Sequence, residues 1–173
     1  MREEGGMKKR VAYLETSFVS YLTGWVSEDE KVARDQSATR RWWKEEGAKW
    51  HCVVSEPVLV EAMAGAPEAV ARRMEVLEGL EVLKTTEEAR KLADALVQAH
   101  ALPEKARTDA LHVALAAMRG ADLLLTWNCR HIANSSMVTK IAVTLDRLGY
   151  RCPDLATPAQ RLEERIDHVE RNP

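Results

Sequence analysis

The sequence predicts an α/β fold, a three-layer α/β/α sandwich with a short, mainly parallel central sheet. Short apolar segments alternate with longer helix-prone segments along the 173 residues. The apolar segments have no polar face, a pattern typical of parallel strands that helices cover on both sides. No internal repeat, low-complexity tract or interdomain linker interrupts the alternation. We therefore expect a single domain over residues 8–166, with flexible termini at 1–7 and 167–173.

Local signals support each element in turn. The expected strands are short apolar segments at 11–14, 51–55, 81–84, 122–126 and around 151–156. The expected helices occupy 16–24, 28–46, 57–65, 66–79, 86–100, 103–120, 137–148 and the stretch from 158 onward. Thr16 and Ser17 can cap the first helix, which Gly24 ends. Pro57 and Pro158 suit the first turn of their helices, because a proline there loses no helical hydrogen bond.

Composition restricts the classes of protein that fit. The 46% apolar content describes a globular chain with a real core, and the net charge of −2 argues against a coat of positive charge. No apolar run approaches the ~20 residues that span a bilayer, and the N-terminal MREEGGMKKR lacks the apolar core of a signal peptide. Three cysteines without a CxxC spacing argue against a disulfide framework or a zinc ribbon. We therefore expect a cytoplasmic protein without a membrane association.

Polar residues follow two of the expected strands. Glu15 comes directly after the strand at 11–14, and Asn128 follows the strand at 122–126. In an open parallel sheet, ligands bind beyond the carboxyl ends of the strands. Glu61 and Asp109 lie on helices in otherwise apolar surroundings. These four positions can share one site if the first and fourth strands are neighbours.

Each of these residues also has an ordinary structural explanation when taken alone. Glu15 can be a charge at a helix start, Glu61 a solvated helix residue, and Asp109 a first-turn acid. His112, one turn after Asp109, is more simply a hydrogen-bonded packing residue than a metal ligand. The joint placement of the acids is what favours a functional site.

The chain resembles PIN-domain proteins, the fold of VapC-type toxin ribonucleases, over roughly residues 10–160. The resemblance rests on YLETSFVSYL, on the glutamate of SEPVLVEAMAG and on TDALHVALAAMRGADLLLTWNCRHIAN. It implies a PIN-like sandwich whose acids bind Mg²⁺ or Mn²⁺ and hydrolyse RNA phosphodiester bonds. The family's four acidic positions fall on Glu15, Glu61, Asp109 and Asn128.

The resemblance also implies roles for these and neighbouring residues. Glu15, Asp109 and Asn128 would bind the metal, and Glu61 would be a ligand or a base that orients water. The residues expected to support the ligands are Ser17, Thr126 and His112. Arg130 and His131 are expected to contact the substrate phosphate. The tryptophans of RRWWKEEGAKW at 40–50 suit a helix–core boundary better than stacking on bases.

Two hypotheses about function follow. The first is a metal-dependent endoribonuclease, the toxin of a type II toxin–antitoxin pair or a related RNA-processing nuclease. For such a protein the resemblance implies an RNA substrate, a small antitoxin partner and a homodimer. The second is a catalytically weak PIN-fold module that binds nucleic acid or protein, because Glu15 is longer than the usual aspartate and Asn128 lacks a charge. A doubly wound nucleotide-binding protein is disfavoured, since neither GxGxxG nor GxxxxGK[ST] occurs.

Overall fold

The computed structural model describes residues 9–171, with side chains described as far as Arg165. Its centre is a sheet of five strands in the order β3-β2-β1-β4-β5, and all four strand pairs are parallel. The strands are β1 (Val11–Leu14), β2 (His51–Ser55), β3 (Glu81–Leu83), β4 (Leu123–Leu125) and β5 (Asp154–Ala156). The predicted fold class is therefore confirmed, and so is the pairing of the first strand with the fourth.

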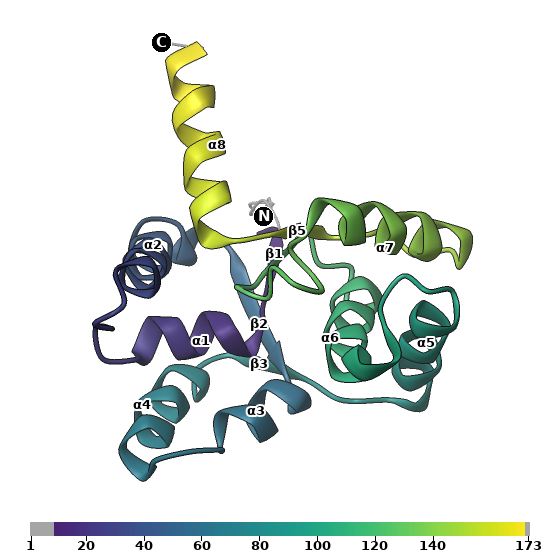
Figure 1. Cartoon of the computed structure of the whole chain (residues 1–173), viewed down its shortest axis with the longest axis horizontal. Helices are drawn as coiled ribbons and strands as arrows, with labels where there is room; N and C mark the ends of the chain where they lie inside the picture. The colour runs from purple at the N-terminus through teal and green to yellow at the C-terminus, as the bar shows by residue number, and fades with distance from the viewer. Residues whose placement is uncertain (1–8, 172–173) are drawn as a thin grey trace, which may run out of the picture.

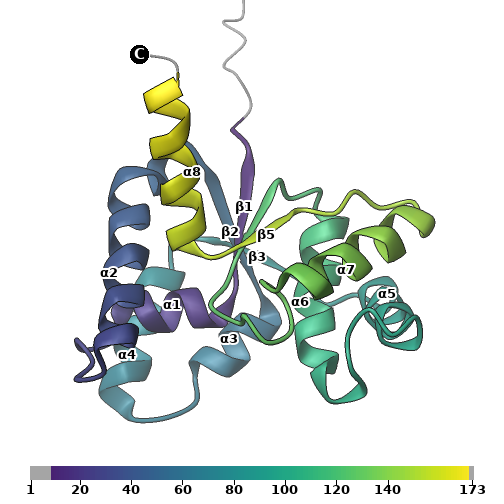
Figure 2. The same ribbon diagram turned by 45° about the horizontal axis from the view of Figure 1, so that its top comes forward.

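Helices cover both faces of this sheet (Figures 1 and 2). One face carries α1 (Thr16–Thr23), α2 (Glu30–Glu45), α3 (Glu56–Ala62) and α4 (Pro67–Leu77). The other carries α5 (Glu87–Gln98), α6 (Arg107–Met118) and α7 (Ser135–Arg147). The last helix, α8 (Pro158–Arg171), packs on α2 and projects away from the sheet. Short 3₁₀ turns at Gly47–Lys49 and Glu104–Ala106 precede β2 and α6.

Burial on both faces explains why the sequences of the central strands are almost entirely apolar. Every residue of β1 and β4 is buried, because helices lie against both faces of these two strands. Helix α6 is also buried around most of its circumference, as its sequence predicted. Trp42 is buried and lies edge-on to Phe18, with ring centroids 5.6 Å apart. This position agrees with the predicted helix–core boundary.

Several boundaries differ from the expected ones, and three of these differences have a local reason. The cap of α1 is Glu15, and Thr16 and Ser17 instead form its first turn. Helix α7 begins at Ser135 because the Asn134 side chain accepts hydrogen bonds from the backbone N–H groups of Ser136 and Met137. The stretch after Pro103 first forms the 3₁₀ turn before α6 begins. Helix α8 continues past residue 166, where we placed the domain end, and the predicted flexible segment 1–7 lies outside the described residues.

None of the helices within residues 9–171 is both long enough and apolar enough to cross a membrane.

Candidate metal centre

The centre lies where β1 and β4 end side by side. Leu14 pairs with Leu125 in the parallel register, and the backbone N–H of Glu15 donates to the Leu125 carbonyl at 3.0 Å. The residues that follow the two strands, Glu15 and Thr126, are therefore neighbours at the carboxyl edge of the sheet. The register thus brings together two residues that lie more than 100 positions apart in the sequence.

Glu15 is a buried carboxylate that is held through one oxygen. Its Oε2 atom accepts hydrogen bonds from the Ser17 N–H at 3.2 Å, from the Ser17 hydroxyl and from the Thr126 hydroxyl at 2.6 Å. An acceptor at this position satisfies N–H groups that the helix leaves unpaired, and the helix dipole favours its negative charge. Its Oε1 atom accepts no hydrogen bond from the residues described. One oxygen of Glu15 thus remains available to a ligand.

Glu61 is held in the same one-sided way from α3. Its Oε1 atom accepts hydrogen bonds from the Thr16 hydroxyl at 2.8 Å and from His112 Nε2 at 2.7 Å. Burial would raise the pKa of Glu61, but the hydrogen bond and charge of His112 and the bond from Thr16 lower it below its ordinary value. The carboxylate is therefore ionised at neutral pH. Its Oε2 atom accepts no hydrogen bond within the described part of the chain.

A buried hydrogen-bond chain lies behind Glu61. His112 Nδ1 bonds the Tyr13 hydroxyl at 2.7 Å, which bonds the Ser55 hydroxyl at 2.6 Å. All three side chains are fully buried, and they come from α6, β1 and the end of β2. Burial and the charges of Glu15 and Glu61 raise the pKa of Tyr13, against a smaller lowering by Ser55, so its hydroxyl stays protonated. Because a carboxylate only accepts, Nε2 of His112 carries the proton of the bond to Glu61.

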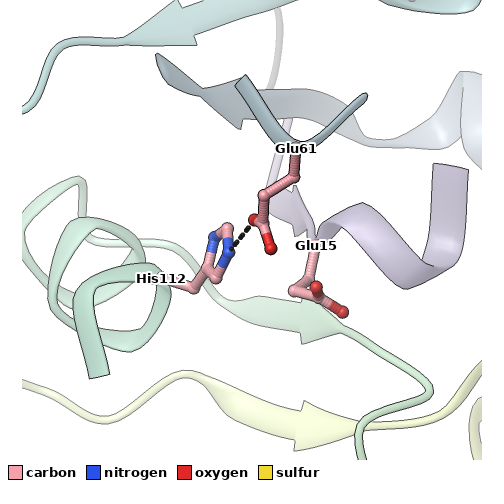
Figure 3. Close-up of side chains that lie close together, drawn as sticks. All are labelled: Glu15, Glu61 and His112. Atoms are coloured by element: carbon pink, nitrogen blue, oxygen red, sulfur yellow. Dashed lines mark hydrogen bonds and ion pairs between the residues drawn. The ribbon is translucent and has the colours of Figure 1, made fainter. Parts of the chain in front are cut away.

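Glu15, Glu61 and His112 form a compact cluster of candidate ligands (Figure 3). One ligand atom from each lies within 4.8 Å of the others. Both ring nitrogens of His112 are already hydrogen-bonded, so the histidine holds Glu61 in place rather than offering a free lone pair. The free oxygens are Glu15 Oε1 and Glu61 Oε2. One or two carboxylates that leave the remaining positions to water suit Mg²⁺ or Mn²⁺.

Asp109 and Asn128 form a second cluster beside the first. Asp109 Oδ2 bonds His131 Nδ1 at 2.8 Å, and Asn128 Oδ1 accepts from the His131 backbone N–H at 3.0 Å. The Asn128 N–H in turn donates to the Thr126 hydroxyl at 2.9 Å, the same hydroxyl that holds Glu15. The two clusters are therefore linked through Thr126, but Asp109 is not a member of the three-residue group.

Comparison with known proteins places this arrangement in a family. A family model described as PIN domain matches residues 12–132, a segment that holds Glu15, Glu61, Asp109 and Asn128. The chain belongs to the PIN domain family. No curated protein matches the chain.

Solved PIN-like structures share the fold at low sequence identity. Mycobacterium tuberculosis VapC20, described as a toxin that cleaves the sarcin–ricin loop, is 18% identical with a TM-score of 0.52, over 65% of this chain and 86% of that chain. A toxin–antitoxin complex from Klebsiella pneumoniae is 19% identical with a TM-score of 0.51, over 73% and 93%. VapBC2 from Rickettsia felis, bound to a DNA fragment from its promoter, is 15% identical with a TM-score of 0.51, over 85% and 96%.

Within this PIN fold the structure separates the four predicted positions into two pairs. Glu15 and Glu61 belong to the three-residue cluster, and each keeps one oxygen that accepts no hydrogen bond from the described residues, whereas Asp109 Oδ2 and Asn128 Oδ1 bond His131. Ser17, Thr126 and His112 each hydrogen-bond one of the two clustered glutamates. Arg130 is exposed, and His131 is partly buried against Asp109.

Sequence reasoning missed Thr16, Tyr13 and Ser55 as parts of this PIN centre. Thr16 and Ser17 were read as helix-capping residues, so the bond from Thr16 to Glu61 was not foreseen. Tyr13 was counted only as part of an apolar strand. Its hydroxyl inside a fully buried aliphatic strand was the available signal, since such a group requires a hydrogen-bond partner.

Proposed function

We propose that the protein is a metal-dependent endoribonuclease that hydrolyses RNA phosphodiester bonds. In the cell it would act as the toxin of a type II toxin–antitoxin pair or as a related RNA-processing nuclease. One observation carries the proposal: two ionisable carboxylates at the carboxyl edge of a PIN fold are each fixed through one oxygen and free at the other. This arrangement suits a cation better than a structural ion pair, because neither free oxygen has a basic partner among the described residues.

The residues of the centre have distinct tasks in this proposal. A bound Mg²⁺ or Mn²⁺ supplies charge to the phosphate and lowers the pKa of a coordinated water. Glu15 and Glu61 would hold the ion, each through the oxygen that no described residue bonds, and Asp109 and Asn128 would contribute from the neighbouring cluster. The Ser17 and Thr126 hydroxyls fix Glu15, while Thr16 and His112 fix Glu61. Asp109 orients the His131 ring, which together with Arg130 contacts the phosphate of the substrate.

Partners follow from the same chemistry. Two of the structural neighbours are described as a toxin–antitoxin complex and as VapBC2. We propose that a small antitoxin likewise binds this chain, and that the chain forms a homodimer. An antitoxin arginine reaching the free carboxylate oxygens would form charge-assisted hydrogen bonds and displace the ion. These carboxylates thus provide a simple means of inhibition.

A catalytically weak PIN-fold binding module is the second candidate. A specific observation favours it: Asn128 contributes no charge, and its side-chain oxygen already accepts from the His131 backbone. Asp109 likewise bonds His131. If these bonds persist in solution, two carboxylates alone hold the ion, and metal affinity is correspondingly low.

An RNA cleavage assay tests the proposal. Wild-type protein is compared with Glu61→Gln and Asp109→Ala in Mg²⁺ or Mn²⁺, with Glu75→Gln as a matched control because Glu75 is exposed on α4 away from the cluster. We expect cleavage by the wild type and the control, and a loss of about 100-fold or more in the other two variants, with circular dichroism unchanged. RNA binding without cleavage by the wild type would instead support the binding module.

A further inference from the structure

A trough extends from Glu61 across the face of α5 and α6. A hollow of about 400 Å³ lies between α3 and these two helices, and its lining includes Glu61, Arg90, Thr108 and Leu111. A second hollow of about 340 Å³ shares Arg90, Thr108 and Leu111 with it and extends to Arg107. Because the two hollows share three lining residues, they form one continuous surface, here called the α5–α6 trough. One end of it is therefore the candidate metal centre.

Charge is distributed unevenly along the trough. Arg107 is neutralised by ion pairs with Asp94 and Glu104. Glu56, in the wall near Glu61, is bonded to the backbone N–H of Thr85 at 2.8 Å. Arg90 lines both hollows and forms no ion pair with any acidic side chain of the described residues. The trough thus has an acidic end at Glu61 and an unpaired guanidinium in its middle.

The walls add groups suited to a nucleotide. Pro57 and Val60 of α3 and Leu111 of α6 supply apolar surface, and the side chains of Thr85 and Thr108 supply hydroxyl groups. Neither hydroxyl has a hydrogen-bond partner within residues 9–165. Volumes of this size lie in the range of ~300–1,000 Å³ that small-molecule sites occupy. Apolar surface, hydroxyls and an unpaired arginine together match a base, a ribose and a phosphodiester.

We propose that the α5–α6 trough binds the RNA strand next to the cleaved bond, with Arg90 contacting a phosphodiester of that strand. This inference rests on the proposed function, since it takes the Glu61 end as the point of cleavage. A cation held at the centre and the guanidinium of Arg90 would give two positive charges along one strand. Thr108, which lines both hollows together with Arg90, donates to a phosphate or ribose oxygen. An acidic peptide would also suit Arg90, and its binding is therefore one of the outcomes that the test below distinguishes.

Equilibrium binding of a fluorescent single-stranded RNA oligonucleotide tests this proposal, with Ca²⁺ in place of Mg²⁺ to suppress cleavage. Arg90→Ala should weaken binding about five- to tenfold and lower the slope of log affinity against log salt by about 0.7, the contribution of one phosphate contact on a single strand. Arg90→Lys should restore part of the affinity. Lys91→Ala is the matched control, because Lys91 is the exposed neighbouring cation on α5 that lines neither hollow.

The outcomes separate this proposal from the proposed function. Unchanged RNA affinity in Arg90→Ala, or an equal loss of affinity in Lys91→Ala, would overturn the proposal that the trough binds RNA. Cleavage by the wild type would still support the proposed function. Arg90-dependent RNA binding without cleavage in Mg²⁺ or Mn²⁺ would support the trough and contradict the nuclease. Unchanged RNA affinity together with Arg90-dependent binding of polyglutamate would assign the trough to an acidic protein and overturn the proposal.

Discussion

At the scale of single residues, the centre is governed by which oxygen of each glutamate is already hydrogen-bonded. Glu15 is fixed by groups close to it in sequence and by Thr126, whereas Glu61 depends on His112 from another helix. The support of Glu61 therefore extends through His112 to Tyr13 and Ser55. Substitutions of these buried residues should therefore weaken metal binding at the surface site.

Replacing Tyr13 with phenylalanine tests this connection. The change leaves His112 Nδ1 and the Ser55 hydroxyl buried without a partner, which costs about 1–3 kcal/mol in the free energy of unfolding. Because His112 then loses its anchor, we also expect weaker Mn²⁺ binding. Urea denaturation and Mn²⁺ titration measure the two effects. Tyr21→Phe is the control, since Tyr21 stacks on Trp127 and its hydroxyl bonds no described residue; equal stability and metal affinity in both variants would contradict the connection.

At the scale of elements, ion pairs stabilise the edge strand β3 at its amino-terminal end. Glu81 at the start of β3 bonds Arg119 at the end of α6 and His51 at the start of β2. Arg119 and then His51 lower the pKa of Glu81 to about 2. These contacts join the edge strand to α6, the helix that carries Asp109 and His112.

The pH dependence of stability follows from that lowered pKa. A carboxyl with a depressed folded-state pKa contributes stability above its unfolded value, and the contribution is lost as pH falls toward 2. We expect Glu81→Gln to destabilise the protein by less than about 1 kcal/mol at pH 7, because the pair is partly exposed. The difference from wild type should vanish as the pH falls from about 5 to 2, as measured by urea midpoints. A difference that is constant with pH would exclude this origin.

The N-terminal cap of α7 also stabilises a single element of the fold. Asn134 ends the polar loop that holds Asn128 and His131, and its side chain satisfies the first N–H groups of α7. Asn134→Ala should lower stability by about 1 kcal/mol. Ser135→Ala, one residue later and exposed, should change it much less in the same thermal unfolding experiment. Similar losses in the two variants would contradict the capping role.

At the scale of the whole molecule, the sequence predicted the fold and the edge of the sheet at which the polar residues gather. Both follow from local periodicity and from the rule that parallel strands end at a common edge. The division of the four positions into two pairs was not predictable. The bonds that create it join residues such as Glu61 and His112, which are 51 positions apart. Only the packing of α3 against α6 decides such contacts.

The central claim is that Glu15 and Glu61 share one divalent ion through their free oxygens. Calorimetric titration of Mn²⁺ into the wild type, Glu15→Gln, Glu61→Gln and the control Glu75→Gln tests it most directly. We predict one site in the wild type and the control, with affinity at least about tenfold weaker in each of the other two variants, because each loses one of only two clustered carboxylates. Mn²⁺ affinity unchanged by either substitution would contradict the claim.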